Sequence, residues 1–218
     1  GGLNRPSPTD HSREKLAGNA MASENSRPYG GVRILDLTRE LGSYCTRLFA
    51  DLGAEVIRIE APEGRADRRT PPTLTGVDPA SFGGVPFAFF NLNKKSVTLD
   101  LKTPAGRAVF DDLVAASQVV VYEAGREAEI ELAQILAVPG VRVVTAISYF
   151  GLTGPYSISV GSDLGAQAVG GIAWLSGEPG KPPLQLAGQQ SVFVTSLYAA
   201  AATAIALWHT EGQGVGHM

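Results

Sequence analysis

The alternation of short apolar runs with helical patterns between residues 32 and 148 constrains the fold of this chain more than any other feature. Runs rich in Val, Ile and Leu are separated by segments with helical spacing, which is typical of βαβ units with right-handed crossovers. The sequence therefore predicts an α/β fold, a Rossmann-like open parallel sheet with helices on both faces. The expected strands are 32–38, 55–60, 96–101, 118–123 and 141–148.

Helical segments fill the gaps between these strands and continue after them. Thr103 and Pro104 suit the start of a helix, because Thr caps the first turn and Pro fits the first helical position. The Ala-rich segment Val192–Trp208 is shorter than the ~20 apolar residues that span a membrane. We therefore expect a buried helix there and no membrane partner. The expected helices are 42–52, 103–116 and one near 127–137, and two apolar segments follow at about 162–176 and 190–209.

The composition limits the class of function. Lys and Arg number 18 and Asp and Glu 21, a formal net charge of -3, which argues against a nucleic-acid partner. Cys45 is the single cysteine, so an internal disulfide and a multi-Cys zinc site are excluded, and we expect a cytoplasmic protein. Cys45 itself is expected to be a small buried residue. The polar segment 1–30 has no signal-peptide core and is expected to form a flexible arm.

The common nucleotide and nucleophile motifs are absent. The chain has no G-x-x-x-x-G-K-[ST] sequence, no G-x-G-x-x-G turn after the first strand and no G-x-S-x-G elbow. Its three histidines, His11, His209 and His217, lie in the arm and near the C-terminus, so neither a Ser/His/Asp triad nor a metal site is predicted.

Several blocks in a fixed order carry a more specific signal. The most specific is Asn-x-x-Lys-x-Ser-x-x-x-Asp-x-Lys at 91–102. In this order and spacing the blocks resemble the N-terminal part of the class III coenzyme A transferases, which include formyl-CoA, carnitine-CoA and bile-acid CoA transferases and α-methylacyl-CoA racemase. The blocks are 31–64, 89–114, 148–156, 161–171 and the last apolar helix with the TEGQG that follows it.

The resemblance implies a large domain built from both ends of a longer chain, with a small domain between them. Residues 31–218 are then the N-terminal part of that large domain, truncated before the small domain. It also implies an interlocked homodimer or a partner half or subunit. The expected ligands are an acyl-CoA and a carboxylic acid as substrates, with no tightly bound cofactor.

The resemblance also indicates where CoA binds. The segment Leu99, Asp100, Leu101 and Lys102 matches the family segment that lines the adenine and phosphate end of CoA. From the residues alone, Lys94, Lys95 and Lys102 form a local basic cluster suited to the 3′-phosphate. The alternative is that these lysines belong to a solvated strand edge.

The catalytic position departs from the family. Family transferases attack the acyl-CoA with an aspartate just before the Ala-rich helix, forming an anhydride and then an aspartyl-CoA thioester. Here Gln189 or Gln190 holds that position, and a carboxamide has no anionic oxygen for the attack. Asp163 is the fallback carboxylate, although with Gln167 it can instead orient the loop or cap a helix. The family racemases carry a His where this chain has Ser162.

Three hypotheses follow. The first is a CoA-transferase module that moves CoA between an acyl-CoA and a carboxylic acid but is itself the non-catalytic half or subunit. The second is an active transferase or racemase that uses another carboxylate, such as Asp163. The third is a CoA-binding scaffold subunit without chemistry. Residues 122–126 favour the first, because they read Tyr-Glu-Ala-Gly-Arg where the family usually has Asn-Phe-x-Pro-Gly at a loop that contacts CoA.

Overall fold

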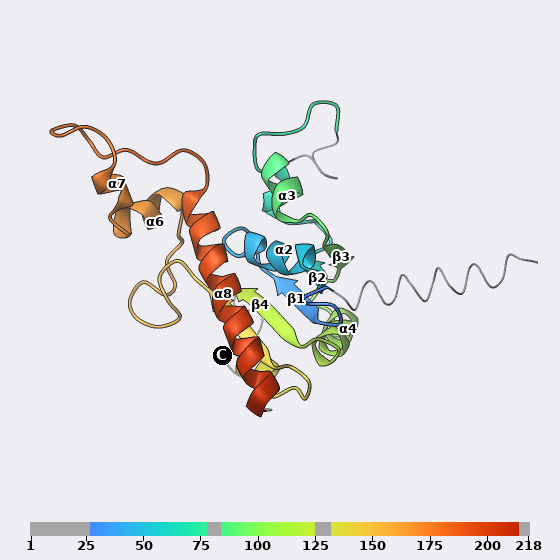
Figure 1. Ribbon diagram of the computed structural model, residues 1–218. Helices are drawn as coiled ribbons and strands as arrows, with labels where there is room; N and C mark the ends of the chain where they lie inside the picture. Colours follow the sequence, from blue (N-terminus) through green and yellow to red (C-terminus); the bar gives the residue numbers. More distant parts are fainter. Residues whose placement is uncertain (1–26, 78–83, 125–131, 214–218) are drawn as a thin grey trace, which may run out of the picture.

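The computed structural model describes residues 27–77, 84–124 and 132–213, which form an open sheet with helices on both faces (Figure 1). Within these residues, five strands pair in parallel in the order β3-β2-β1-β4-β5. The arrangement confirms the predicted α/β fold. The strands are β1 (Arg33–Leu37), β2 (Glu55–Glu60), β3 (Lys95–Thr98), β4 (Val119–Glu123) and β5 (Val143–Ile147).

Two apolar layers pack against the sheet, because successive residues of a strand point to opposite faces. The helices are α2 (Ser43–Asp51), α3 (Val85–Phe90), α4 (Pro104–Ala115), α5 (Leu132–Leu136), α6 (Asp163–Val169), α7 (Ile172–Leu175) and α8 (Gln190–Gln213), with a 3-10 helix η1 (Ala66–Arg69). On β1, Ile34 belongs to the layer formed with α2 and α8, and Leu35 to the layer formed with α4 and α5.

Local signals set most of the helix boundaries. The Oγ1 of Thr103 accepts the backbone N–H of Gly106 at 3.1 Å, which confirms the predicted cap, and Pro104 is the first residue of α4. The apolar segment 162–176 forms two helices, because Gly171 takes a φ of 80°, in the left-handed region that favours glycine. The predicted helix near 127–137 begins outside the described residues. Its described part contains α5.

The third strand is shorter than the predicted strand over 96–101. After β3 the chain turns, because the Oδ1 of Asp100 accepts the N–H of Lys102 at 3.0 Å and its carbonyl accepts the N–H of Thr103. Local bonds of this kind from Asp compete with strand pairing. The segment 99–102 therefore lies in the turn at the carboxyl end of β3.

Helix α8 is less buried than predicted. It packs on α2 and β5 with one stripe of side chains, and in the apolar stretch Gln190–Glu211 only 22% of the residues are buried. The expectation of a buried helix is therefore wrong for most of its surface, because no described element covers the opposite side. By length and composition α8 also meets the requirement for crossing a membrane, which is weak evidence when a single helix does so. The buried stripe is Val192, Ser196, Thr203, Leu207 and Thr210.

The end of the predicted arm joins the folded part. Residues 1–26 lie outside the described residues, but Tyr29 packs its ring edge-on against Phe49, with 4.8 Å between ring centroids. The N–H of Tyr29 also donates to the carbonyl of Leu52 at 3.2 Å. Tyr29, which the sequence assigned to the arm, therefore packs against the folded part of the chain.

Candidate active site

The turn between β1 and α2 lies at the carboxyl edge of the sheet, where open α/β sheets place their ligands. One carboxylate organises it. The Oε2 of Glu123, at the end of β4, accepts the backbone N–H groups of Arg39, Glu40 and Leu41 at 2.7, 2.9 and 3.0 Å. Three N–H groups that converge on one anion hold the turn in a single conformation.

Gln189, just before α8, contacts this turn through its side chain. Its Nε2 donates to the Oε1 of Glu40 at 2.5 Å, and both residues line a shallow hollow at the carboxyl edge. Gln190 instead begins α8 and donates from its side chain to the carbonyl of Ala187 at 2.8 Å. Of the two predicted positions, Gln189 is therefore the one whose side chain contacts the site. The hollow is lined by Arg39, Glu40, Ser43, Asp67, Thr70, Pro86, Phe87, Phe90, Asn91 and Gln189.

Asp163 anchors the start of α8. Its Oδ1 accepts the N–H and the hydroxyl of Ser191 at 2.8 and 2.6 Å. Its Oδ2 accepts the amide groups of Gln167 and Gln185 at 2.6 and 3.0 Å. Burial alone would raise the pKa of Asp163, but these hydrogen bonds outweigh it and hold the pKa below its ordinary value. The cap of α6 is Ser162, whose hydroxyl accepts the N–H of Gly165.

Burial and nearby acidic groups shift the pKa of both Glu40 and Tyr149. Partial burial of the Glu40 carboxyl, followed by the nearby charge of Glu123, raises the pKa of Glu40 above its ordinary value, although the residue keeps contact with solvent. Burial and the charges of Glu40, Glu123 and Asp163 likewise raise the pKa of Tyr149. Tyr149 therefore stays a neutral hydroxyl at neutral pH.

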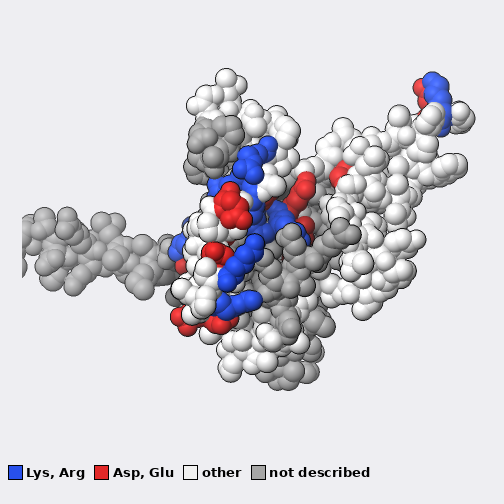
Figure 2. Space-filling view, turned by 180° about the vertical axis from the view of Figure 1, so that it is seen from behind, with Lys and Arg blue, Asp and Glu red and all other residues white. Residues whose placement is uncertain are grey.

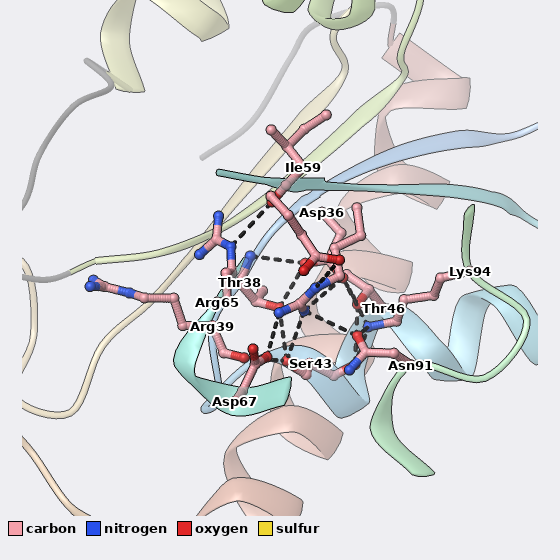
Figure 3. A network of polar contacts seen from close by, with 12 residues as sticks. Asp36, Thr38, Arg39, Ser43, Thr46, Ile59, Arg65, Asp67, Asn91 and Lys94 are labelled. Atoms are coloured by element: carbon pink, nitrogen blue, oxygen red, sulfur yellow. Dashed lines mark hydrogen bonds and ion pairs between the residues drawn. The ribbon is translucent and has the colours of Figure 1, made fainter. Parts of the chain in front are cut away.

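A network of buried charges lies next to this turn (Figure 3). Asp36 on β1 is fully buried, and its Oδ2 accepts the Nζ of Lys94 and the hydroxyl of Thr46, both at 2.8 Å. Its Oδ1 accepts the N–H and hydroxyl of Thr38. Burial disfavours the charge on Asp36, but Lys94 and Arg58 outweigh it and hold the pKa of Asp36 well below its ordinary value.

Arg58 extends this network across β2. Its side chain is 1% exposed, pairs with Asp67 and donates to Asn91 Oδ1 at 3.0 Å. Two buried polar atoms of this pair, Arg58 Nε and Asp67 Oδ1, have no hydrogen-bond partner. Next to it, Arg68 binds both oxygens of Glu60 at 2.5 and 2.7 Å.

The structure does not bring the three predicted lysines together. Lys94 is buried, with its Nζ bonded to Asp36, to Asn91 and to the carbonyl of Ser43, each at 2.8 Å, so it belongs to the core. Lys95 begins β3 at the amino edge of the sheet, where it pairs with Glu55 at 2.6 Å. Lys102 lies with Leu99, Asp100 and Leu101 at the carboxyl edge.

Three functional positions were not singled out by the sequence. Asp36 lies between the buried Leu35 and Leu37 of β1, which is a signal for a paired buried charge. Glu123 ends the apolar β4, but its partners lie 82 to 84 positions away. Glu40 is one of two charged residues in a turn, and nothing in its local sequence indicates its contact with Gln189.

Neither Cys45 nor a metal-binding group of side chains provides a reactive site within the described residues. Cys45 is fully buried in α2, as predicted, and burial, reinforced by the nearby Asp36, raises the pKa of its thiol to about 12. The thiol is therefore not a nucleophile at neutral pH. Among the described residues, no group of three or more His, Cys, Asp and Glu side chains could hold a metal ion.

Comparisons with known proteins agree with this architecture. Residues 29–218 match the model of CoA-transferase family III. The chain is 34% identical over 195 residues to the succinyl-CoA:(R)-benzylsuccinate CoA-transferase subunit BbsE of Thauera aromatica, covering 87% of this chain and 47% of the relative. It is also 34% identical over 199 residues to the succinyl-CoA–L-malate CoA-transferase alpha subunit of Chloroflexus aurantiacus, covering 88% of this chain and 45% of the relative.

A solved structure shows the same fold. A CAIB/BAIF family protein from Brucella suis superimposes with a TM-score of 0.80 at 31% sequence identity, covering 88% of this chain and 52% of that chain. The chain thus spans about half the length of the relatives it matches. Since the family model matches residues 29–218 and two CoA-transferase subunits share 34% of their aligned residues with it, this chain belongs to CoA-transferase family III.

Proposed function

We propose that this chain is part of an enzyme that moves CoA between an acyl-CoA and a carboxylic acid. The match to family III over residues 29–218 carries the proposal. The names of both relatives begin with succinyl-CoA. Succinyl-CoA is therefore the first donor to test, together with dicarboxylic acids as acceptors.

The test uses the complete enzyme that contains this chain. It is incubated with succinyl-CoA and a panel of mono- and dicarboxylic acids, and the new acyl-CoA is quantified by chromatography. We expect transfer to at least one acid at rates typical of enzymes, about 1–10³ s⁻¹. A reaction without acceptor acid is the control, because it measures hydrolysis of the thioester alone. Failure of the panel to yield any new acyl-CoA would contradict the proposed activity.

The segment 99–102 is the proposed contact for CoA in this half. It lies at the carboxyl edge, and Lys102 is exposed there. We expect Lys102→Ala to weaken CoA binding about tenfold, the equivalent of roughly 1.4 kcal/mol, because a charge-assisted bond to phosphate is lost. Lys95→Ala is the matched control, since Lys95 pairs with Glu55 at the other edge. Calorimetry that finds equal affinity for both variants would exclude this contact.

A partner subunit or a second copy is the proposed partner of this chain. The names of both relatives call them subunits. In this chain, the outward side of α8 exposes large apolar residues, including Trp208 at 77%. An exposed apolar patch of this kind is typical of an interaction surface. We therefore expect the sheet and α8 to be covered in the complete assembly, as in the interlocked dimer that the family resemblance implies.

A non-catalytic role for this half is the second candidate, and Gln189 favours it. The structure gives this amide the place beside the hollow, and an amide does not attack a thioester. In such an enzyme a carboxylate of a partner subunit would carry the covalent step. A scaffold subunit that binds CoA without chemistry would behave identically in isolation. The two are separated by whether the assembly still transfers CoA when this chain's site is altered.

A further inference from the structure

Residue 189 is a glutamine and carries no carboxylate, but Glu40, on the turn between β1 and α2, does. The Oε1 of Glu40 accepts the amide N–H of Gln189 at 2.5 Å, so the carboxylate and the amide are adjacent. We propose that Glu40 is the nucleophile of this site and forms the covalent intermediate in CoA transfer. This inference rests on the proposed CoA transfer and assigns it a residue.

Both sides of the Glu40–Gln189 contact are held in place. On one side, the N–H of Glu40 donates to Glu123, together with those of its two neighbours. On the other side, Asp163 fixes the start of α8 through Ser191, one residue beyond Gln190. A nucleophile needs such fixed surroundings, because an error of about 1 Å in position costs about 10²-fold in rate.

The neighbouring carboxylates are already engaged. Glu123 accepts three backbone N–H groups through Oε2. Both oxygens of Asp163 accept hydrogen bonds from side chains or backbone, and Asp67 is paired with Arg58. Within the part of the chain that the structure describes, the one hydrogen bond to the Glu40 carboxylate comes from a neutral amide, and Glu40 lines the hollow. The Oδ1 of Asp67 has no hydrogen-bond partner either, but it is buried and its carboxylate is paired with Arg58. Of the two carboxylates that line the hollow, Glu40 is therefore the exposed one.

The chemistry balances without any further group. A carboxylate oxygen of Glu40 attacks the thioester carbonyl carbon, the C–S bond breaks, and CoA leaves as a thiolate from a mixed anhydride. The thiolate attacks the glutamyl carbonyl, releases the first acid as its carboxylate and forms a glutamyl-CoA thioester. The incoming carboxylate repeats the two steps in reverse order, which yields the new acyl-CoA and restores Glu40. No electron is gained or lost, and no net proton is transferred.

The local field supports this assignment. Burial and the charge of Glu123 raise the pKa of Glu40, which makes its carboxylate more basic than that of an ordinary glutamate. A more basic oxygen is the stronger nucleophile. The activity should therefore decline on acidification at a higher pH than the ordinary glutamate value of 4.5 would give. The amide of Gln189 directs the carboxylate and is a positioning group.

Trapping the intermediate tests the proposal directly. The complete enzyme is incubated with succinyl-CoA, quenched with hydroxylamine and digested with trypsin. Hydroxylamine converts an anhydride or thioester on a glutamate to a hydroxamate. Cleavage after Arg39 and Arg47 releases the peptide 40–47, in which Glu40 is the single acidic side chain. We expect the hydroxamate on this peptide, which assigns it to Glu40 without any mutation.

Three variants complete the experiment. Glu40→Gln should remove the hydroxamate and lower CoA exchange by about 10⁴-fold, as loss of a covalent nucleophile does. Gln189→Ala should lower the exchange far less and keep the label on peptide 40–47. Glu63→Gln is the matched control, because Glu63 is an exposed carboxylate outside the hollow, and it should change neither readout.

The possible results separate this inference from the proposed function. Exchange by the unaltered enzyme with the hydroxamate on another peptide, or on a partner subunit, overturns the role of Glu40 and leaves CoA transfer intact. Unchanged exchange in Glu40→Gln does the same and favours the non-catalytic half. Absence of exchange in the unaltered enzyme overturns both. Because the label is mapped on the unaltered enzyme, the result stands even if a variant fails to fold.

Discussion

Two halves of the molecule differ in which side chains they bury. One half surrounds β1 and β2, and the other is formed by α6, α7 and α8. In the first half, charges are buried and paired with one another, as with Asp36 and Lys94, which are 0% and 2% exposed. In the second half, apolar side chains face outward, as with Tyr198 at 76%. Figure 2 shows the molecule from behind. Lys, Arg, Asp and Glu gather over one half of this view, and few lie over the other half apart from a small group at its far tip.

The difference shows which parts of this chain are complete by themselves. Buried charges are tolerated only when they are paired and hydrogen-bonded, and the first half supplies nearly all of those partners from within the chain. Exposed apolar area of this extent is typical of surfaces that meet a partner. We therefore expect the charged half to govern the stability of this chain and the apolar half to govern its assembly.

The largest expected effect is at the buried charge pair. Lys94→Met leaves the buried carboxylate of Asp36 without its cation, and we expect a loss of about 3–5 kcal/mol in the free energy of unfolding. Urea denaturation measures this value. Lys95→Met is the matched control, because Lys95 is 69% exposed and should lose at most about 1 kcal/mol. A similar small loss in both variants would contradict the assignment of Lys94 to the core.

The next effect distinguishes the two sides of α8. Leu207 is 4% exposed in the stripe that packs on the sheet, so Leu207→Ala should lower the free energy of unfolding by about 2–4 kcal/mol. Ile205, two positions earlier, is 67% exposed. We expect Ile205→Ala to change the same quantity by about 0.5 kcal/mol or less. Equal losses in denaturation experiments would mean that α8 has no preferred buried side.

A smaller effect concerns the anchor of α8 and its dependence on pH. Asp163→Asn weakens the bonds to Ser191 and should cost about 1–2 kcal/mol at neutral pH. The folded-state pKa of Asp163 is lowered, so its stabilisation is complete above the ordinary value of 3.8 and is lost as the pH falls below it.

The difference between this variant and the unaltered chain should therefore shrink on acidification. Urea denaturation repeated at several pH values measures the difference. Asp111→Asn on the exposed side of α4 serves as the control and should differ little from the unaltered chain at any pH. A difference that grows as the pH falls would contradict the lowered pKa.

The smallest effect on stability is expected on the outward side of α8. Trp208→Ser should change the free energy of unfolding by about 0.5 kcal/mol or less, because the ring is 77% exposed. The same variant should reduce association with a second copy or a partner, measured by sedimentation velocity. Stability lost without any change in association would show instead that this ring is covered within the chain itself.

The local sequence was sufficient for the five strands and for helices α2 and α4, but it did not predict η1 or α3. The strand at 55–60 and the start of α4 at Pro104 follow from apolar periodicity and from capping, which act over a few neighbouring residues. The family blocks then identified the family, whose model matches residues 29–218. The turn at 99–102 was missed, because the side chain of Asp100 decides it, and the apolar run hides that signal.

The site and the surface depended on contacts between distant segments. Gln189 meets Glu40 across 149 positions. Lys94 looked like a surface cation, yet it lies against Asp36, 58 positions away. The Ala-rich composition of α8 predicted burial, but only packing against α2 and β5 determined which side is covered. Periodicity and caps report the conformation of a segment, whereas the pairing and burial of a charge depend on which other segment folds against it.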